Sequence, residues 1–227
     1  MKLLSEQELI WSSVVANNSM NRKRVAFGVN SYEKELNLNP ATYLDGCLEK
    51  HESCSWLDLC CGEGNALLQY ATGKAAKNAQ ANIALKGIDL VDYFSPVSSN
   101  ISCLTFETAP LVTYQIEGKF DLITCVHGLH YIGDRLKVLF KAIHALTPEG
   151  IFLANFDLNN IKVKGDSNHL TLKKLFTDNG ILYDGRQKII RCEGPRSLSA
   201  CYNYIGADDT IGPNYTGQPT VAAYYSI

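Results

Sequence analysis

The sequence predicts an α/β protein with a Rossmann-like, mostly parallel seven-stranded sheet, helices on both faces and antiparallel C-terminal strands. Between residues 54 and 180, apolar strand-like runs alternate with helical patterns, which is typical of right-handed βαβ units. A glycine-rich turn follows the first of these runs. Beyond residue 180, strand-like runs follow one another with no credible helix between them.

Each expected element rests on its own pattern. Helices are expected at 5–16, 40–50, 64–72, 133–146 and 168–179, and strands at 54–59, 85–90, 101–106, 120–126, 151–156, 187–191, 200–205 and 221–226. Pro40 suits the first turn of its helix, and Gly73 and Gly180 suit helix ends. The last strands are expected at the end of the main sheet.

Composition narrows the function classes. With 227 residues, 46% of them apolar, the chain can bury a full core. A net charge of −2 offers no basic face for nucleic acid. No run of 18 apolar residues suggests a membrane span, and the first eight residues do not resemble a signal peptide. The eight cysteines show no C-x-x-C spacing, so we expect no metal site and a reduced, cytoplasmic protein.

The strongest motif is the run from Trp56 to Gly64, in which an apolar strand reaches Asp58 and then Gly62 and Gly64 lead into a helix. Glycines let the backbone approach a ligand closely, and ligands of open α/β sheets bind at the carboxyl ends of the strands. Asp89 ends the next strand, where a carboxylate can accept hydrogen bonds from ribose hydroxyls. The third glycine of the dinucleotide fingerprint is replaced by Leu67, and no P-loop Gly-Lys-Ser/Thr is present.

This combination resembles the class I S-adenosylmethionine-dependent methyltransferases over residues 54–157. Phe120-Asp-Leu-Ile and Leu146-Thr-Pro-Glu-Gly150 resemble the family's later motifs, with Glu149 in place of a usual glycine. The resemblance implies S-adenosylmethionine as cofactor and a single domain over 1–227. Within it, 1–50 would form N-terminal helices and a lid, 51–180 the cofactor-binding core and 181–227 the antiparallel strands. The implied cofactor contacts are Asp58, Cys60, Gly62, Gly64, Asp89, Leu90, Glu107, Thr108 and Cys125, with Glu107 as the candidate for the adenine amino group.

Two histidines follow the fourth strand, where the resemblance places the methyl group. His127 and His130 are the catalytic candidates, because histidine titrates near neutrality and can take a proton from an alcohol, phenol or ammonium group. The alternative is that His130 packs beside the cofactor and His127 caps a strand end. Asp157, after the fifth strand, is either a further acid or a turn cap.

Residues 19–32 are expected to form a lid over the cofactor. Arg22 or Arg24 would hold the methionyl carboxylate as a bidentate fork, with Tyr32 as a further donor. A solvated basic loop anchored by Val25 and Phe27 is the alternative.

The acceptor is expected to be a small molecule. The chain lacks the Asn/Asp-Pro-Pro-aromatic run of amino-methylating DNA enzymes and the Pro-Cys nucleophile of cytosine-C5 enzymes. Tyrosines crowd the last strands, which suits an amphipathic acceptor. The alternatives are a propylamine transferase of the same fold and a non-catalytic S-adenosylmethionine-binding partner subunit. Whether the acceptor atom is O, N, S or C, and whether the chain forms a homodimer, stays open.

Overall fold

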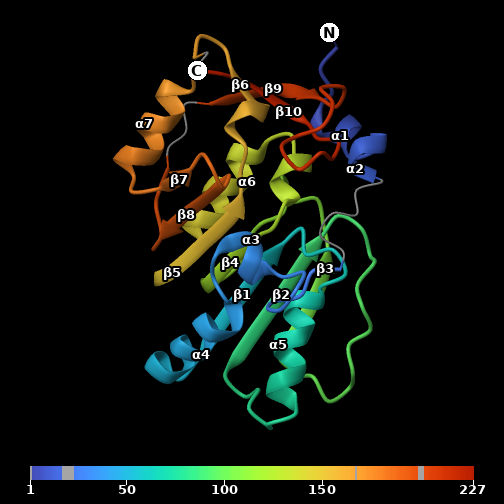
Figure 1. Ribbon diagram of the computed structural model, residues 1–227, viewed down its shortest axis with the longest axis vertical. Coiled ribbons are helices and arrows are strands. Elements are labelled where there is room, and N and C mark those ends of the chain that lie inside the picture. The colour runs from blue at the N-terminus through green and yellow to red at the C-terminus, as the bar shows by residue number, and fades with distance from the viewer. Residues whose placement is uncertain (1, 17–22, 167, 199–201) are drawn as a thin grey trace.

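The computed structural model describes residues 2–16, 23–166, 168–198 and 202–227 (Figure 1). Its main sheet has seven strands in the order β3-β2-β1-β4-β5-β8-β7. The five parallel strands are β1 (Cys54–Leu59), β2 (Ile83–Asp89), β3 (Leu104–Thr108), β4 (Phe120–Cys125) and β5 (Leu146–Asn155). Strand β8 (Ile189–Glu193) runs antiparallel to β5, and β7 (Leu182–Asp184) runs antiparallel to β8. This confirms the predicted fold class.

Strand β1 shows why the sheet is covered on both sides. Trp56 belongs to one core with α4 (Pro40–His51) and α5 (Asn65–Ala75). Leu57 and Leu59 belong to a second core on the other face, with α6 (Arg135–His144) and α7 (Leu170–Asp178). Because side chains alternate along a strand, a continuous apolar run places buried groups on both faces. The strand order reverses direction between β1 and β4, so a crevice is expected at their carboxyl ends.

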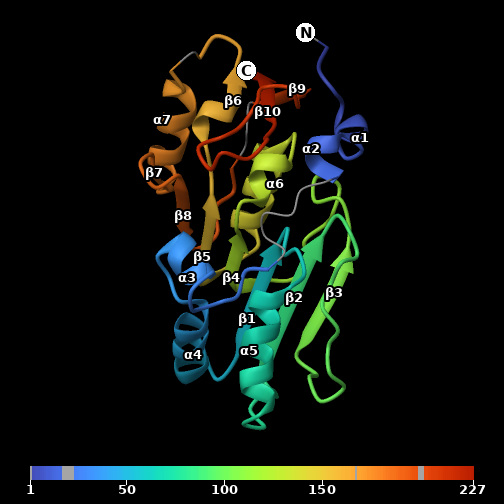
Figure 2. The same cartoon turned by 45° about the vertical axis from the view of Figure 1, so that its right-hand side comes forward.

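The last two strands form a separate sheet, which corrects the expectation that they extend the main one. This sheet has the order β6-β10-β9, with β6 (Ile161–Val163), β9 (Asn203–Asp208) and β10 (Ala222–Ser226), and Figure 2 shows it above the main sheet. The hairpin β7–β8 already occupies the edge next to β5. Leu4 continues the small sheet through an antiparallel bridge to Ala207, so the N-terminal segment is tied to the C-terminal strands.

The expected helix over 5–16 is wrong, because two short helices stand there. Helix α1 (Glu6–Leu9) begins at Ser5, which forms a reciprocal capping box with Glu8. Helix α2 (Ser13–Ala16) follows Ser12, whose hydroxyl and carbonyl both accept from the amide of Val15. Each serine starts its own helical turn, so the apolar pattern spans two helices.

Two short strands and one short α-helix were absent from the sequence prediction, and several predicted ends differ from the structure. Strand β5 begins at Leu146 and not at residue 151, so it includes the predicted turn at 146–150. Strands β6 and β7 have three residues each, too few to show a period. Helix α3 (Tyr32–Leu36) has five residues and begins at Ser31, which accepts a hydrogen bond from the amide of Lys34. Helix α5 passes through Gly73 to the buried Ala75, because burial against the sheet outweighs the roughly 1 kcal/mol cost of a helical glycine. No helix in the described ranges has the length and apolarity needed to cross a membrane.

Candidate active site

The glycine-rich turn between β1 and α5 depends on left-handed backbone. Gly62 and Gly64 have φ values of 61° and 73°, which glycine adopts without strain. A Cβ on Gly64 would lie 2.2 Å from the ring of Phe106. Cys60 has φ 56° as well, and for a residue with a side chain this costs on the order of 1 kcal/mol or more. The left-handed backbone and the close approach of Phe106 therefore restrict which residues the turn can accept.

Asp89 connects this turn to the end of β2. Its Oδ2 accepts a hydrogen bond from the amide of Gly62 at 2.8 Å, and its Oδ1 accepts one from the amide of Val91 at 3.2 Å. A cavity opens here, and of the predicted site residues Cys60, Gly62, Asp89, Leu90 and His127 line it. The structure thus brings these five together.

Mostly apolar groups from two other regions complete the cavity. One wall is the loop 109–112, and another comes from the N-terminal helices with Glu6, Ile10, Val15 and Ala16. The loop is held by Lys141 on α6, whose Nζ donates to the carbonyls of Leu111 at 2.7 Å, Val112 at 3.2 Å and Tyr114 at 2.6 Å. Burial lowers the pKa of Lys141 to about 8. Sequence reasoning missed the contribution of the N-terminal helices, whose apolar residues gave no sign of what they cover.

Asp58 and Tyr32 contact each other instead of facing the cavity. Asp58 is fully buried, and its carboxylate accepts hydrogen bonds from Tyr32 Oη at 2.7 Å and from Thr124 Oγ1 at 2.6 Å. Trp56 Nε1 donates to Thr124 at 2.8 Å. Burial raises the pKa of Asp58 to about 7, although the two hydrogen bonds act in the opposite direction. This geometry makes Asp58 the anchor of α3.

Arg24 points to Glu35, and Arg22 lies outside the described residues. The Arg24 guanidinium forms an ion pair with Glu35 at 2.9 Å and donates to Asn30 Oδ1 at 2.5 Å. The surrounding loop is fixed to α5, because Gln69 Oε1 accepts from the amides of Ala26 and Phe27 at 2.9 and 3.1 Å. Neither Arg24 nor Tyr32 is among the described residues that line the cavity. Cofactor contacts by these two side chains, and lid closure by 19–32, stay predictions that this geometry does not favour.

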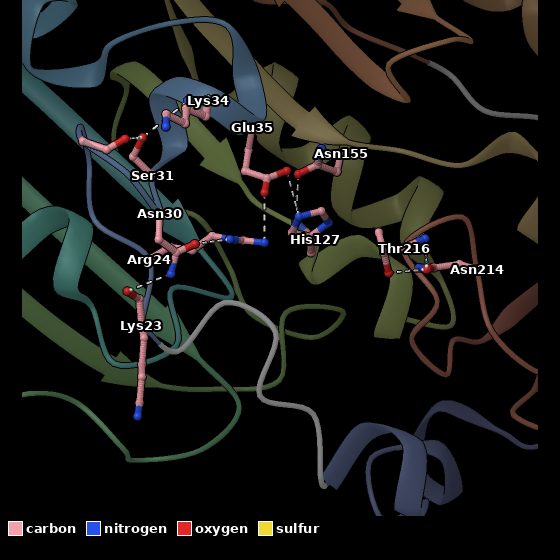
Figure 3. A network of polar contacts seen from close by, with 11 residues as sticks. Lys23, Arg24, Asn30, Ser31, Lys34, Glu35, His127, Asn155, Asn214 and Thr216 are labelled. Carbon is pink, nitrogen blue, oxygen red and sulfur yellow. Dashed lines mark hydrogen bonds and ion pairs between the residues drawn. The ribbon is translucent and has the colours of Figure 1, made fainter.

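His127 is the histidine that reaches the cavity. It follows β4 with φ 57°, and its amide donates to Asn155 Oδ1 at 3.1 Å. Its Nε2 lies 3.0 Å from Glu35 Oε2, as Figure 3 shows together with Arg24. This hydrogen bond lowers the pKa of the Glu35 carboxyl against the opposing effect of burial. Glu35 was not identified from the sequence, since it lies 92 residues from His127 on a helix too short to be recognised.

His130 is buried away from the cavity. Its ring stands 5.9 Å from that of His127 and 5.5 Å from that of Tyr215, between ring centroids. Burial, with the charge of Arg135, holds the pKa of His130 well below its ordinary value, so the ring is neutral near pH 7. A catalytic role for His130 and its packing beside the cofactor both stay predictions that this burial does not favour.

The remaining predicted residues make contacts of their own. Glu107 pairs with Lys86 at 2.7 Å and accepts from Tyr114 Oη at 3.0 Å. Within the described chain, Glu107, Thr108, Cys125 and Gly64 do not line the cavity. Asp157 accepts from the amide of Asn159 at 3.1 Å and caps a short turn. Among the residues that the structure describes, no group of three or more His, Cys, Asp or Glu could hold a metal ion.

A sequence model of a family described as a methyltransferase domain matches residues 29–182, well over half of the 227 residues. The chain belongs to the methyltransferase-domain family. Enzymes of this class take their methyl group from S-adenosylmethionine, which is therefore the cofactor of this domain. No protein of curated function matches the chain by sequence.

Solved structures resemble this chain over about half of its length. YjhP from E. coli is 21% identical, with 50% of this chain and 46% of that chain covered and a TM-score of 0.38. The S-adenosylmethionine-bound amino pentose methyltransferase CalS10 from Micromonospora echinaspora is 17% identical, with 51% and 48% covered and a TM-score of 0.38. The sugar N-methyltransferase KedS8 from Streptoalloteichus is 15% identical, with 52% and 49% covered and a TM-score of 0.38. The matched part spans about half of each solved chain.

Proposed function

We propose that this methyltransferase domain transfers the methyl group of S-adenosylmethionine to the O or N atom of a small-molecule acceptor. The observation that carries the proposal is a single cavity whose lining combines the glycine-rich turn, Asp89 and His127. Displacement at a sulfonium methyl needs the acceptor held close and in line, with water excluded. A cavity that joins a cofactor turn to an imidazole supports such an arrangement.

The cofactor side of the cavity has groups of suitable chemistry. The Asp89 carboxylate accepts hydrogen bonds from two backbone amides. Because a carboxylate has about four acceptor positions, it can also accept hydrogen bonds from ribose hydroxyls. Leu90 and Val91, opposite the loop 109–112, offer apolar walls for an adenine ring. When bound, the cofactor supplies the electrophilic methyl group.

The acceptor side favours a compact molecule with an apolar body. Ile10, Val15 and Ala16 from the N-terminal helices and Ile132 after β4 contribute apolar surface. Such walls with few polar groups are typical of small-molecule sites. The net charge of −2 gives no electrostatic support for a nucleic-acid acceptor.

Calorimetry tests the cofactor half of the proposal. We expect saturable binding of S-adenosylmethionine and S-adenosylhomocysteine, with NAD as the control ligand that gives no binding. Binding of NAD, with no heat from either sulfur compound, would overturn it.

Transfer of a labelled methyl group tests the acceptor half. Incubation with methyl-labelled S-adenosylmethionine and a metabolite extract should place label in the small-molecule fraction. Label found only in protein or nucleic acid would contradict the acceptor class, and binding without any transfer would favour a non-catalytic partner subunit.

A further inference from the structure

A carboxylate and an imidazole form a partly buried pair beside the cavity. Glu35 Oε2 meets His127 Nε2 at 3.0 Å, and the His127 side chain is only 3% exposed while that of Glu35 is 29% exposed. An ionised carboxylate only accepts hydrogen bonds, so a neutral His127 must carry its proton on Nε2. Its Nδ1 then keeps a lone pair, and Nδ1 is buried without a hydrogen-bond partner among the described residues.

Glu35 is held on both of its oxygens. Its Oε1 pairs with Arg24 Nη2 at 2.9 Å, while Oε2 faces His127, and Arg24 is itself bonded to Asn30. The carboxylate therefore cannot rotate away from the ring without losing the Arg24 contact. The hydrogen bond with His127 is the main cause that lowers the pKa of Glu35, and the charge of Arg24 adds to it. The carboxylate therefore stays ionised and does not take the His127 proton.

The backbone fixes the other end of the imidazole. Asn155 Oδ1 accepts the His127 amide at 3.1 Å, and His127 adopts a left-handed φ of 57°. The other titratable side chains with rings near this group are His130, 5.9 Å from His127, and Tyr215, which packs on His130. Contacts from α3, β5 and the 23–31 loop together hold a histidine that lines the cavity.

We propose that Glu35 is the positioning residue for His127, and that this pair serves acceptors that react through a hydroxyl group. The inference rests on the proposed methyl transfer. A neutral amine attacks with its lone pair and needs no base during the displacement, whereas an alcohol or a phenol must lose its proton. A base oriented by a carboxylate is therefore matched to an O–H nucleophile. Because the cavity walls are largely apolar, we expect the rest of the acceptor molecule that carries this hydroxyl to be apolar.

The acceptor O–H proton moves to His127 Nδ1 as the oxygen forms a bond to the methyl carbon. The bond between that carbon and sulfur breaks, its electron pair stays on sulfur, and S-adenosylhomocysteine and a methyl ether result. The imidazolium formed on His127 is stabilised by Glu35 and later releases its proton to water.

The experiment compares Glu35→Gln with Glu33→Gln, a matched change on the same helix. Glu33 accepts from Asn39 and has no contact with His127. In ¹⁵N-histidine-labelled protein, the wild type and Glu33→Gln should show a far-downfield imidazole N–H proton resonance. This resonance should be lost or shifted upfield in Glu35→Gln, and Glu35→Asp, which keeps the charge, should retain part of it. Identical resonances in all four proteins would contradict the hydrogen bond between Glu35 and His127.

Methyl transfer to phenol and to 4-nitrophenol gives the second readout. For phenol, we expect kcat of Glu35→Gln to fall about 10- to 100-fold with KM for S-adenosylmethionine little changed. 4-Nitrophenol is largely ionised above neutrality, so its kcat should be nearly the same in wild type and variant. A purely structural role for Glu35 predicts equal losses with both phenols, and that result would overturn the inference. Methylation of amines but of no hydroxyl compound by the wild type would overturn the acceptor class.

S-adenosylhomocysteine affinity distinguishes a failure of the proposed role of Glu35 from a failure of the proposed methyl transfer. It should stay within about twofold of wild type in Glu35→Gln, since one removed hydrogen bond lies outside the cofactor contacts. If S-adenosylhomocysteine affinity is intact but kcat falls equally with both phenols, only the proposed role of Glu35 is refuted. Absence of S-adenosylhomocysteine binding to the wild type refutes the proposed function itself.

Discussion

The turn at residues 60–64 and the segment at 23–36 both lie at the carboxyl ends of the central strands, but they are built differently. The turn uses backbone groups: two left-handed glycines and the amide of Gly62 held by Asp89. The segment uses the tips of side chains, with Tyr32 on Asp58, Glu35 on His127 and Arg24 on Glu35. The glycines that the turn requires can be recognised in the local sequence. A contact between side chains cannot, because it depends on a partner far along the chain.

The largest expected effect concerns Asp58, where the two regions meet. Its folded-state pKa of about 7, against an ordinary 3.8, means that the folded protein binds this proton more tightly than the unfolded chain does. The stability from this proton is fully present below about pH 4 and is lost as the pH rises through about 7, by up to about 4 kcal/mol. Asp58→Asn stays neutral, so it should gain stability relative to wild type as the pH rises.

Urea unfolding of both proteins at pH 5 and pH 8 measures this difference. We expect the Asp58→Asn variant to be the more stable protein at pH 8, with a smaller difference at pH 5. A difference independent of pH would show that Asp58 is ionised throughout, and that Tyr32 and Thr124 compensate fully for its burial.

Asp89→Ala tests the backbone-built region. The change removes the acceptor of the Gly62 and Val91 amides and the proposed ribose contact, so S-adenosylhomocysteine affinity should fall by about 1–3 kcal/mol. Calorimetric titration with S-adenosylhomocysteine measures this change in affinity. Glu107→Ala is the control, because that carboxylate is engaged by Lys86 and Tyr114 and its loss should change affinity less than threefold. Equal losses in both variants would establish Glu107 as a cofactor contact after all.

Tyr32→Phe tests the side-chain-built region. It removes one hydrogen bond to the buried Asp58, which should lower the free energy of unfolding by about 1–2 kcal/mol and leave S-adenosylhomocysteine affinity within threefold. The opposite pattern, with unchanged stability and a tenfold weaker affinity, would mean that Tyr32 contacts the cofactor as the sequence predicts.

Arg24→Met should have the smallest effect on cofactor binding. The guanidinium faces Glu35 and Asn30, so we expect S-adenosylhomocysteine affinity within about twofold of wild type by calorimetry. A loss of tenfold or more would restore the predicted contact between Arg24 and the methionyl carboxylate, and with it the lid.

The sequence predicted best those elements in which buried apolar residues form a run or recur at a regular spacing. Strand β1 matches its predicted bounds of 54–59 at both ends, because its residues pack on both faces of the sheet. The placement of Gly62, Asp89 and His127 at one cavity follows from the strand ends that carry them. Helix α3 and its Glu35 escaped prediction, since five residues give no period and the contact with His127 arises only from tertiary packing.

One amine joins three carbonyls of the loop that forms a wall of the cavity. Lys141 Nζ has three protons, and each meets a different carbonyl of the loop at 111–114. These bonds share a single donor atom, so replacing Lys141 would remove all three at once. Arginine would spread its donors over a plane and glutamine would offer two, so neither can replace this geometry. A residue outside the cavity thereby contributes to the position of one of its walls.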